Sequence, residues 1–104
     1  MANYLLAYTG GSMAQTDAER EAAMAAWGAW FGELGSAVVE AGAPFGPSAS
    51  VTSSGGDGAA PTGLSGYSVI SADSLQAATA LVGKCPVLAH GGKVDVYETI
   101  PVEM

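Results

Sequence analysis

The 104-residue sequence is poor in positive charge, cysteine and histidine. It has three Lys and Arg residues against ten Asp and Glu residues, and its formal net charge is −7. Nucleic acids and anionic membrane surfaces are bound through clustered positive charge, so we expect neither partner. The single cysteine excludes an intrachain disulfide and a metal site built from several thiolates. The single histidine excludes a site built from several imidazoles, and no metal or other cofactor is expected.

Long apolar runs are also missing. No stretch approaches the ~20 apolar residues of a membrane-spanning helix. The first eight residues lack a basic region and soon stop being apolar, so we expect no signal peptide and a cytoplasmic protein. Hydrophobic residues nevertheless make up 49% of the chain and charged residues only 12%, the opposite of the composition of disordered proteins. Residues 1–104 are therefore expected to fold as one domain.

Four segments have the pattern of β-strands. Each is short, contains β-branched or aromatic residues, and is bounded by turns rich in glycine, proline or small polar residues. The second of them, with Val and Thr among serines, is the weakest and is expected at a sheet edge. A glycine-rich connection would join it to the third strand as a hairpin. The four segments are residues 3–8, 48–54, 64–71 and 93–100.

The first expected helix begins at Thr16, where Glu19 completes a capping box, and ends at Gly42. Trp30 lies on the shoulder of its apolar stripe, where it could reach a pocket edge or a neighbouring subunit. Three glycines inside this helix are expected to let its backbone approach the sheet or another chain closely, with a functional bend as the alternative. The stripe itself has spacings of three and four residues and consists of Met24, Trp27, Phe31, Leu34 and Val38.

The second expected helix is short, beginning at Asp73, where Gln76 completes another capping box, and ending at Gly83. Each strand–helix–strand unit is long enough for a right-handed crossover. Two such units joined by a hairpin predict an α+β fold, a ferredoxin-like βαββαβ sandwich. In that fold a four-stranded antiparallel sheet carries both helices on one side.

Such a fold leaves one face of the sheet without a helix. In the last strand Val94 and Val96 alternate with Asp95 and Tyr97, so one face is aliphatic and the other is polar and aromatic. An exposed aromatic face would be an unusual surface, and we predict a homodimer that buries part of it. All tyrosines fall on expected strands, namely Tyr4, Tyr8, Tyr67 and Tyr97.

Three segments of the sequence together resemble a known protein family. They are Trp27-Gly28-Ala29-Trp30-Phe31, then Leu64–Ile70 with Ala72-Asp73-Ser74-Leu75, and finally Cys85–Gly92 with Val94-Asp95-Val96-Tyr97-Glu98. Together they resemble the YCII-related (DGPF-type) family over nearly the whole chain. The resemblance implies a dimeric α+β barrel, with two sheets packed around a cavity, and a small enzyme acting on small organic molecules. The Asp-Gly-Pro-Phe motif and the helix histidine of some members are absent here, so no catalytic pair carries over.

His90 is the candidate catalytic residue, because an unperturbed imidazole has a pKa near 6.5 and exchanges protons near neutrality. It precedes Gly91-Gly92, where a ligand could approach the backbone closely. With Asp73 or Asp95 in reach it could act as a general base in an isomerisation or elimination. The alternative is a loop histidine that bonds a backbone carbonyl or water.

Aromatic residues are the candidates for a ligand-binding wall. Tyr8, Trp30, Tyr67 and Tyr97 could line an apolar cavity or a subunit interface. Cys85 is expected to be buried and structural. Two functions remain open. One is a cofactor-independent enzyme of isomerase or lyase type that uses His90. The other is a non-catalytic module that binds a small ligand or forms a dimeric interaction surface.

Overall fold

A four-stranded antiparallel sheet is the centre of the fold in the computed structural model, which describes residues 2–10, 16–56, 58, 60, 63–89 and 91–101. In space the strand order is β2-β5-β1-β6, and each neighbouring pair is antiparallel. In chain order these strands are β1 (Ala2–Thr9), β2 (Val38–Pro44), β5 (Leu64–Ala72) and β6 (Lys93–Glu98).

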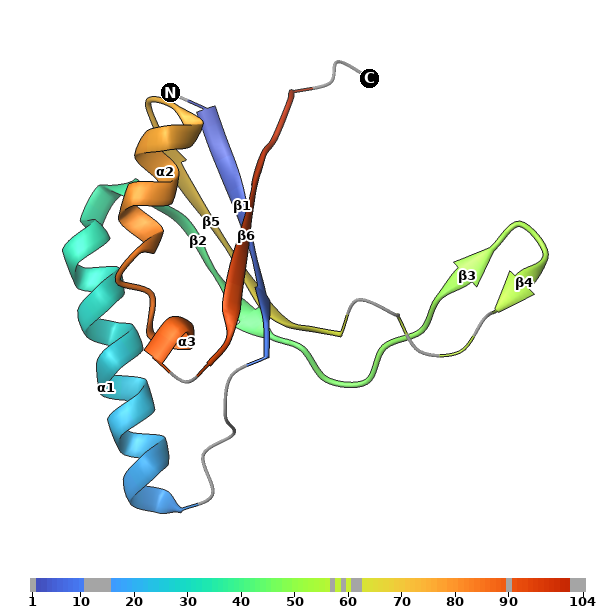
Figure 1. The fold of residues 1–104 in the computed structure, drawn as a ribbon, viewed down its shortest axis with the longest axis horizontal. Coiled ribbons are helices and arrows are strands. Elements are labelled where there is room, and N and C mark those ends of the chain that lie inside the picture. Colours follow the sequence, from blue (N-terminus) through green and yellow to red (C-terminus); the bar gives the residue numbers. More distant parts are fainter. Residues whose placement is uncertain are drawn as a thin grey trace.

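The helices α1 (Asp17–Leu34), α2 (Leu75–Val82) and α3 (Pro86–Ala89) lie on one side of this sheet (Figure 1). A short 3-10 turn over Gly35–Ala37 follows α1. The predicted combination of helices with a four-stranded antiparallel sheet is confirmed. The two-residue strands β3 (Val51–Thr52) and β4 (Gly55–Gly56) form a separate hairpin that projects away from the sheet (Figure 1).

Alternation along β1 explains why the helices cover only one face. Tyr4, Leu6 and Tyr8 are buried beneath the helices, whereas Leu5 and Ala7 point to the other face. The register continues each face across the sheet, because Leu6 pairs with Ser68 and Val96, while Leu5 pairs with Val69 and Tyr97. The core on the helix side consists of Tyr4, Leu6, Tyr8, Trp30, Ile70, Ala72, Ala78, Val82, Cys85 and Val87.

Helix α1 begins where predicted but ends much earlier. Thr16 is the N-cap, and its hydroxyl accepts a hydrogen bond from the Glu19 backbone N–H at 3.1 Å. The helix stops at Leu34, because Gly35 takes a left-handed backbone angle (φ +55°), and the predicted end at Gly42 is wrong. The chain then enters β2 at Val38, which the apolar spacing had placed inside the helix.

The second sheet strand was also predicted in the wrong place. Residues 38–44 form β2, whereas residues 48–54 contribute only β3 to the projecting hairpin. A bulge in β2 between Glu40 and Ala43 contains Gly42, whose φ is +80°. A Cβ at this position would collide with the Tyr67 carbonyl of β5, so only glycine allows the two strands to pair here.

Helix α2 begins one residue later than predicted. Its N-cap is Ser74 and not Asp73, and the Ser74 hydroxyl accepts a hydrogen bond from the Ala77 backbone N–H at 3.0 Å. Helices α1 and α2 are tied together by Trp30, whose indole Nε1 donates to the Leu81 carbonyl at 3.2 Å. This bond satisfies the polar atom of an otherwise buried ring.

Two glycines inside α1 lack the close packing that was predicted for them. Within the described part of the chain, no neighbouring atom lies within 4 Å of a Cβ added at Gly28 or Gly32. Both positions are exposed. The expectation that these glycines let α1 approach another element is therefore wrong for the single chain.

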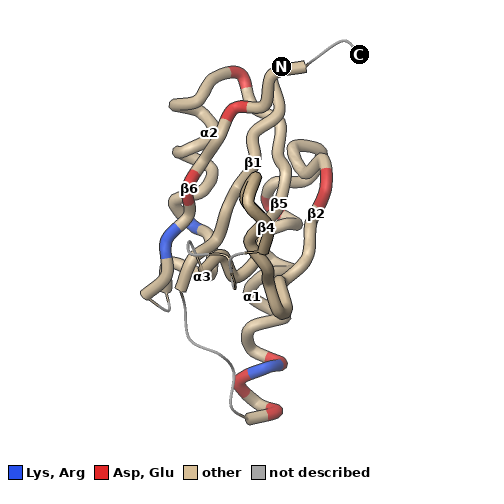
Figure 2. The backbone as a smooth tube through the Cα atoms, turned by 90° about the vertical axis from the view of Figure 1, so that its right-hand side faces the viewer, with Lys and Arg blue, Asp and Glu red and all other residues tan. Residues whose placement is uncertain are grey.

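Figure 2 shows one basic position on α1 and two that lie near each other in this view, beside β6 and α3. Arg20 pairs with Asp17 at 3.3 Å on α1, and Lys93 pairs with Asp95 at 3.6 Å on β6. Lys84 follows α2 and is exposed. In the described residues, no helix has the length and apolar character needed to cross a membrane.

Candidate functional site

A cavity of about 510 Å³ lies between α1, the sheet and α3. Volumes of roughly 300–1,000 Å³ are typical of sites for small molecules. In Figure 1 the first turns of α1 extend past the end of the sheet. The lining residues are Tyr8, Arg20, Ala23, Met24, Trp27, Phe31, Ala41, Gly42, Ala43, Pro44, Ser65, Gly66, Tyr67, Ser68 and Val87.

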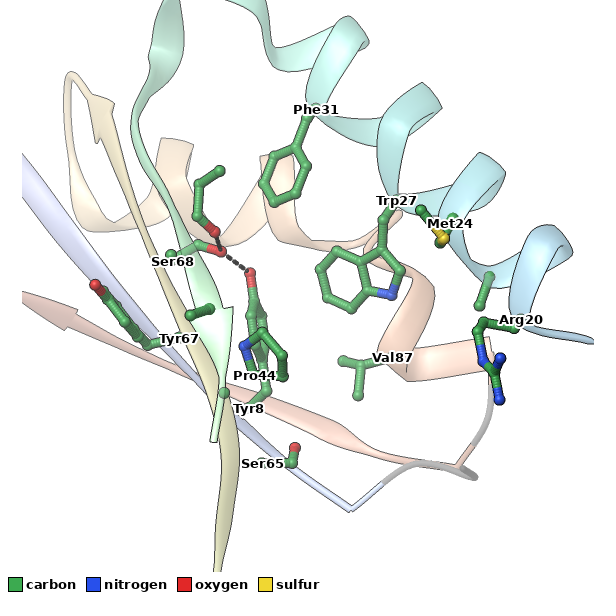
Figure 3. A pocket seen from close by; sticks show the side chains of 15 residues that line it. Tyr8, Arg20, Met24, Trp27, Phe31, Pro44, Ser65, Tyr67, Ser68 and Val87 are labelled. Atoms are coloured by element: carbon green, nitrogen blue, oxygen red, sulfur yellow. Dashed lines mark hydrogen bonds between the residues drawn. The ribbon is translucent and has the colours of Figure 1, made fainter. Parts of the chain in front are cut away.

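Aromatic rings form the inner wall of this cavity (Figure 3). The Trp27 ring meets Tyr8 edge to face, with ring centroids 5.1 Å apart, and lies 5.8 Å from Phe31. Behind them Trp30 contacts both Trp27 and Phe31 from within the core. Contacts of this kind fix ring orientations beyond what burial alone does. The wall is therefore rigid and apolar on the side of α1.

One polar chain crosses the sheet side of the cavity. The Tyr8 hydroxyl donates to Ser68 Oγ at 2.7 Å, and Ser68 Oγ donates to the Ala41 carbonyl at 2.6 Å (Figure 3). These residues come from β1, β5 and β2, so the chain also links three neighbouring strands. Ser68 is the only polar residue in the described chain that is buried as completely as the core residues.

The Tyr8 hydroxyl is neutral at physiological pH. Burial raises the pKa of Tyr8 to about 12, and the hydrogen bond to Ser68 offsets this only in part. The other titratable residues among the lining are Arg20, at the outer edge, and Tyr67. Among the described lining residues there is no His, Asp, Glu or Cys.

Two of the tyrosines suggested as ligand contacts have their side chains on the other face of the sheet. Tyr67 contributes to the cavity floor, but its ring points away from the cavity (Figure 3), stacks on Phe45 at 5.7 Å, and donates its hydroxyl proton to Glu40. This bond raises the pKa of Tyr67. Tyr97 lies on the same open face, and 58% of its surface is exposed.

The two tryptophans have roles opposite to those suggested by their spacing. Trp30, the expected wall residue, is only 3% exposed and belongs to the core. Trp27, on the predicted core stripe, is half-buried and lines the cavity together with Phe31.

His90 lies outside the described residues, so its proposed role is not tested by the structure. Neither of its suggested partners, Asp73 and Asp95, lines the cavity. Asp73 follows Ala72, at the opposite end of the sheet from Lys93: Ala72 pairs with Ala2 and Lys93 with Thr9. The intervening strand has eight residues, a separation of roughly 23 Å at ~3.3 Å per residue.

Asp95 is on β6, next to the Lys93 end of the sheet, but it belongs to the open face. Its carboxylate pairs with Lys93, and Ala7 is its partner in β1. The neighbouring Val94 points to the helix side. The sheet therefore separates the Asp95 side chain from the cavity.

Sequence reasoning missed Ser68 and Gly42, which shape the sheet side of the cavity. Ser68 had a usable signal: it lies two residues before Ile70 in a strand, on a face that is otherwise apolar, and a polar side chain there needs a partner. Cys85 was predicted correctly as buried, with 2% exposure, and burial raises the pKa of its thiol. Among the residues that the structure describes, no three His, Cys, Asp or Glu side chains are grouped so as to hold a metal ion.

Fold and site together define a small α/β chain with a helix-covered antiparallel sheet and an apolar cavity beneath its long helix. No protein-family model, curated protein or solved structure matches the chain. Its function is therefore inferred from the cavity itself.

Proposed function

We propose that the protein binds a small, uncharged, largely apolar molecule in the cavity between α1 and the sheet. This proposal is supported most by the apolar cavity of about 510 Å³ and its aromatic walls. Its one polar chain uses both of its hydroxyl protons in hydrogen bonds within the protein. A cavity of ~150 Å³ suffices for a benzene ring, so this one has room for a fused bicyclic compound. Burial of such a ligand supplies the affinity at roughly 25 cal/mol per Å² of apolar surface, less the cost of association.

Calorimetric titration with indole and with indene tests this proposal. Ala23 lines the cavity from α1, whereas Ala25 is exposed and lies outside it. We expect Ala23→Phe to fill the space and weaken binding at least tenfold, while Ala25→Phe leaves the affinity unchanged. Equal affinities of the two variants, or no binding of either compound to the unmodified protein, would refute the cavity as a binding site.

A catalytic function of the same cavity is the second proposal. It keeps the isomerase or lyase chemistry expected for His90 and needs no cofactor. Val87, which lines the cavity, stands three residues before His90 in the chain and supports it. A turnover screen on small cyclic acids and ketones, with His90→Ala as the control, is the test. We expect turnover to be lost in the variant with ligand affinity kept; turnover unchanged in His90→Ala removes His90 from the reaction.

We propose further that the chain is ferredoxin-like, related to the YCII family, and a homodimer. The strand order β2-β5-β1-β6 supports the first part. The open sheet face supports the dimer, because no helix of the described residues packs on it and Tyr97 and Phe45 are exposed there. A second copy would cover Tyr97, Leu5 and Val69, which the register places side by side. The cytoplasmic location stays a prediction.

A further inference from the structure

The polar chain in the cavity has a fixed direction. The Ala41 carbonyl can only accept a hydrogen bond, and Ser68 Oγ lies 2.6 Å from it, so the single hydroxyl proton of Ser68 points at Ala41. Ser68 can then offer Tyr8 only a lone pair. The Tyr8 proton must lie in the 2.7 Å contact to Ser68. Both hydroxyl protons are therefore used within the protein.

This direction determines what Tyr8 presents to the cavity. The hydroxyl lies, in the view of Figure 3, between Ser68 and the space bounded by Phe31 and Trp27. With its proton committed to Ser68, the Tyr8 oxygen has only acceptor capacity left. Nothing in the described part of the chain donates a hydrogen bond to it. A ligand that enters the cavity can supply this donor in place of water.

We propose that the cavity selects planar, uncharged ligands that carry one hydrogen-bond donor, which meets the Tyr8 oxygen. A planar ligand is favoured because the Trp27 and Phe31 rings, next to Tyr8 in the same wall, offer flat apolar surfaces for stacking. Absence of charge follows from the walls, because the cationic group that lines the cavity, Arg20, is exposed and pairs with Asp17. This inference rests on the proposed binding function and names its ligand class.

Indole and indene are matched probes for this selection. They have nearly the same shape, but only indole carries an N–H donor. A neutral hydrogen bond in a protein site corresponds to a roughly three- to tenfold gain in affinity, and we expect indole to bind tighter than indene by that factor. In Tyr8→Phe the ratio of the two affinities should fall to about one. Tyr4→Phe is the control, because Tyr4 directs its hydroxyl to Glu98 and does not line the cavity.

Ser68→Ala tests the direction of the chain. Without Ser68, the Tyr8 proton has no acceptor in the sheet and turns to the cavity, so Tyr8 becomes a donor. The carbonyl probe 1-indanone should then gain at least threefold in affinity relative to indole. Should this variant fail to fold, the Tyr8→Phe and Tyr4→Phe pair decides the question alone.

The outcomes separate this inference from the proposed function. Equal binding of indole and indene to the unmodified protein overturns donor selection and leaves the binding cavity intact. The same holds if Tyr8→Phe keeps the preference for indole. If neither compound binds, the proposed function fails and the donor selection fails with it.

Discussion

Tyr8 is the residue on which both the core and the cavity depend. Its ring packs against Trp27, its hydroxyl reaches Ser68, and its backbone lies in the central strand. A phenol suits this position because its ring is apolar and its single polar atom needs only one internal partner. Tyr4 lies four residues before Tyr8, on the same face of β1. Its hydroxyl lies near Glu98, and burial together with this carboxylate raises the pKa of Tyr4.

The raised pKa of Tyr8 makes stability fall in alkaline solution. The ordinary pKa of 10.0 applies to the unfolded chain, and the native value is about 12. Between these values the unfolded state has released the proton that the native state keeps, so the free energy of unfolding falls as pH rises. The contribution is complete below pH 10 and is lost as pH passes through about 12.

Denaturant unfolding from neutral to alkaline pH measures this effect. We expect the free energy of unfolding to fall less steeply above pH 10 in Tyr8→Phe than in the unmodified protein. Tyr4 and Tyr67, whose pKa values are also raised, act alike in both proteins and cancel in the comparison. Identical slopes in the two proteins would show that the Tyr8 hydroxyl is not shielded from solvent.

Alanine substitutions at Gly42 and Gly32 are expected to change the free energy of unfolding in opposite directions. Alanine at Gly42 must adopt a φ of +80° and its Cβ would collide with the Tyr67 carbonyl. Left-handed backbone alone costs about 1–2 kcal/mol for a residue with a Cβ, so we expect Gly42→Ala to lower the free energy of unfolding by at least that much. Gly32→Ala, on the open helix surface, should instead raise it by up to about 1 kcal/mol.

Thermal or urea unfolding of the two alanine variants gives the answer. A stable Gly42→Ala protein would mean that the bulge in β2 is not built as described. A loss of stability in Gly32→Ala would mean that an element or a second chain packs closely on this face of α1.

At the scale of elements, the strands were the most predictable part. Short runs of aromatic and β-branched residues bounded by turn residues located β1, β5 and β6 to within about two residues, and in β6 apolar and polar residues also alternate. The end of α1 was not predictable in this way. Val38 follows Leu34 by four residues, which fits a helix, although it begins a strand. Gly35 ends the helix, yet Gly28 and Gly32 lie within it, so residue type alone did not mark the stop.

The cavity depends on how α1 sits over the sheet, which the sequence does not encode locally. Trp27 and Trp30 are one turn apart and equally apolar, so spacing alone cannot say which ring enters the core. The bond from Trp30 to the Leu81 carbonyl of α2, 51 residues away, fixes the choice. The role of Ser68 was likewise not predictable from local sequence, because its hydrogen-bond acceptor, the Ala41 carbonyl, is supplied by β2.

At the scale of the whole molecule, the open face of the sheet leads to a test of the proposed dimer. Tyr97 is exposed on this face, on the edge strand β6, next to Leu5 of β1. We expect the unmodified chain to scatter light as a dimer at micromolar concentrations, and Tyr97→Glu to be monomeric because it would bury an unpaired charge. Ala25→Glu, on the exposed surface of α1, should remain dimeric. The proposed dimer is ruled out if the unmodified chain is monomeric across micromolar concentrations.

The claim that a small molecule binds in the cavity beneath α1 is tested most directly by locating bound indole. Nuclear Overhauser effects between indole and the methyl groups of the protein measure this, because they require protons to be close in space. If indole binds in the cavity, we expect Overhauser contacts with Met24 and Val87, which line it. Contacts with Leu5 and Val69 instead would place the ligand on the open face of the sheet and contradict this claim.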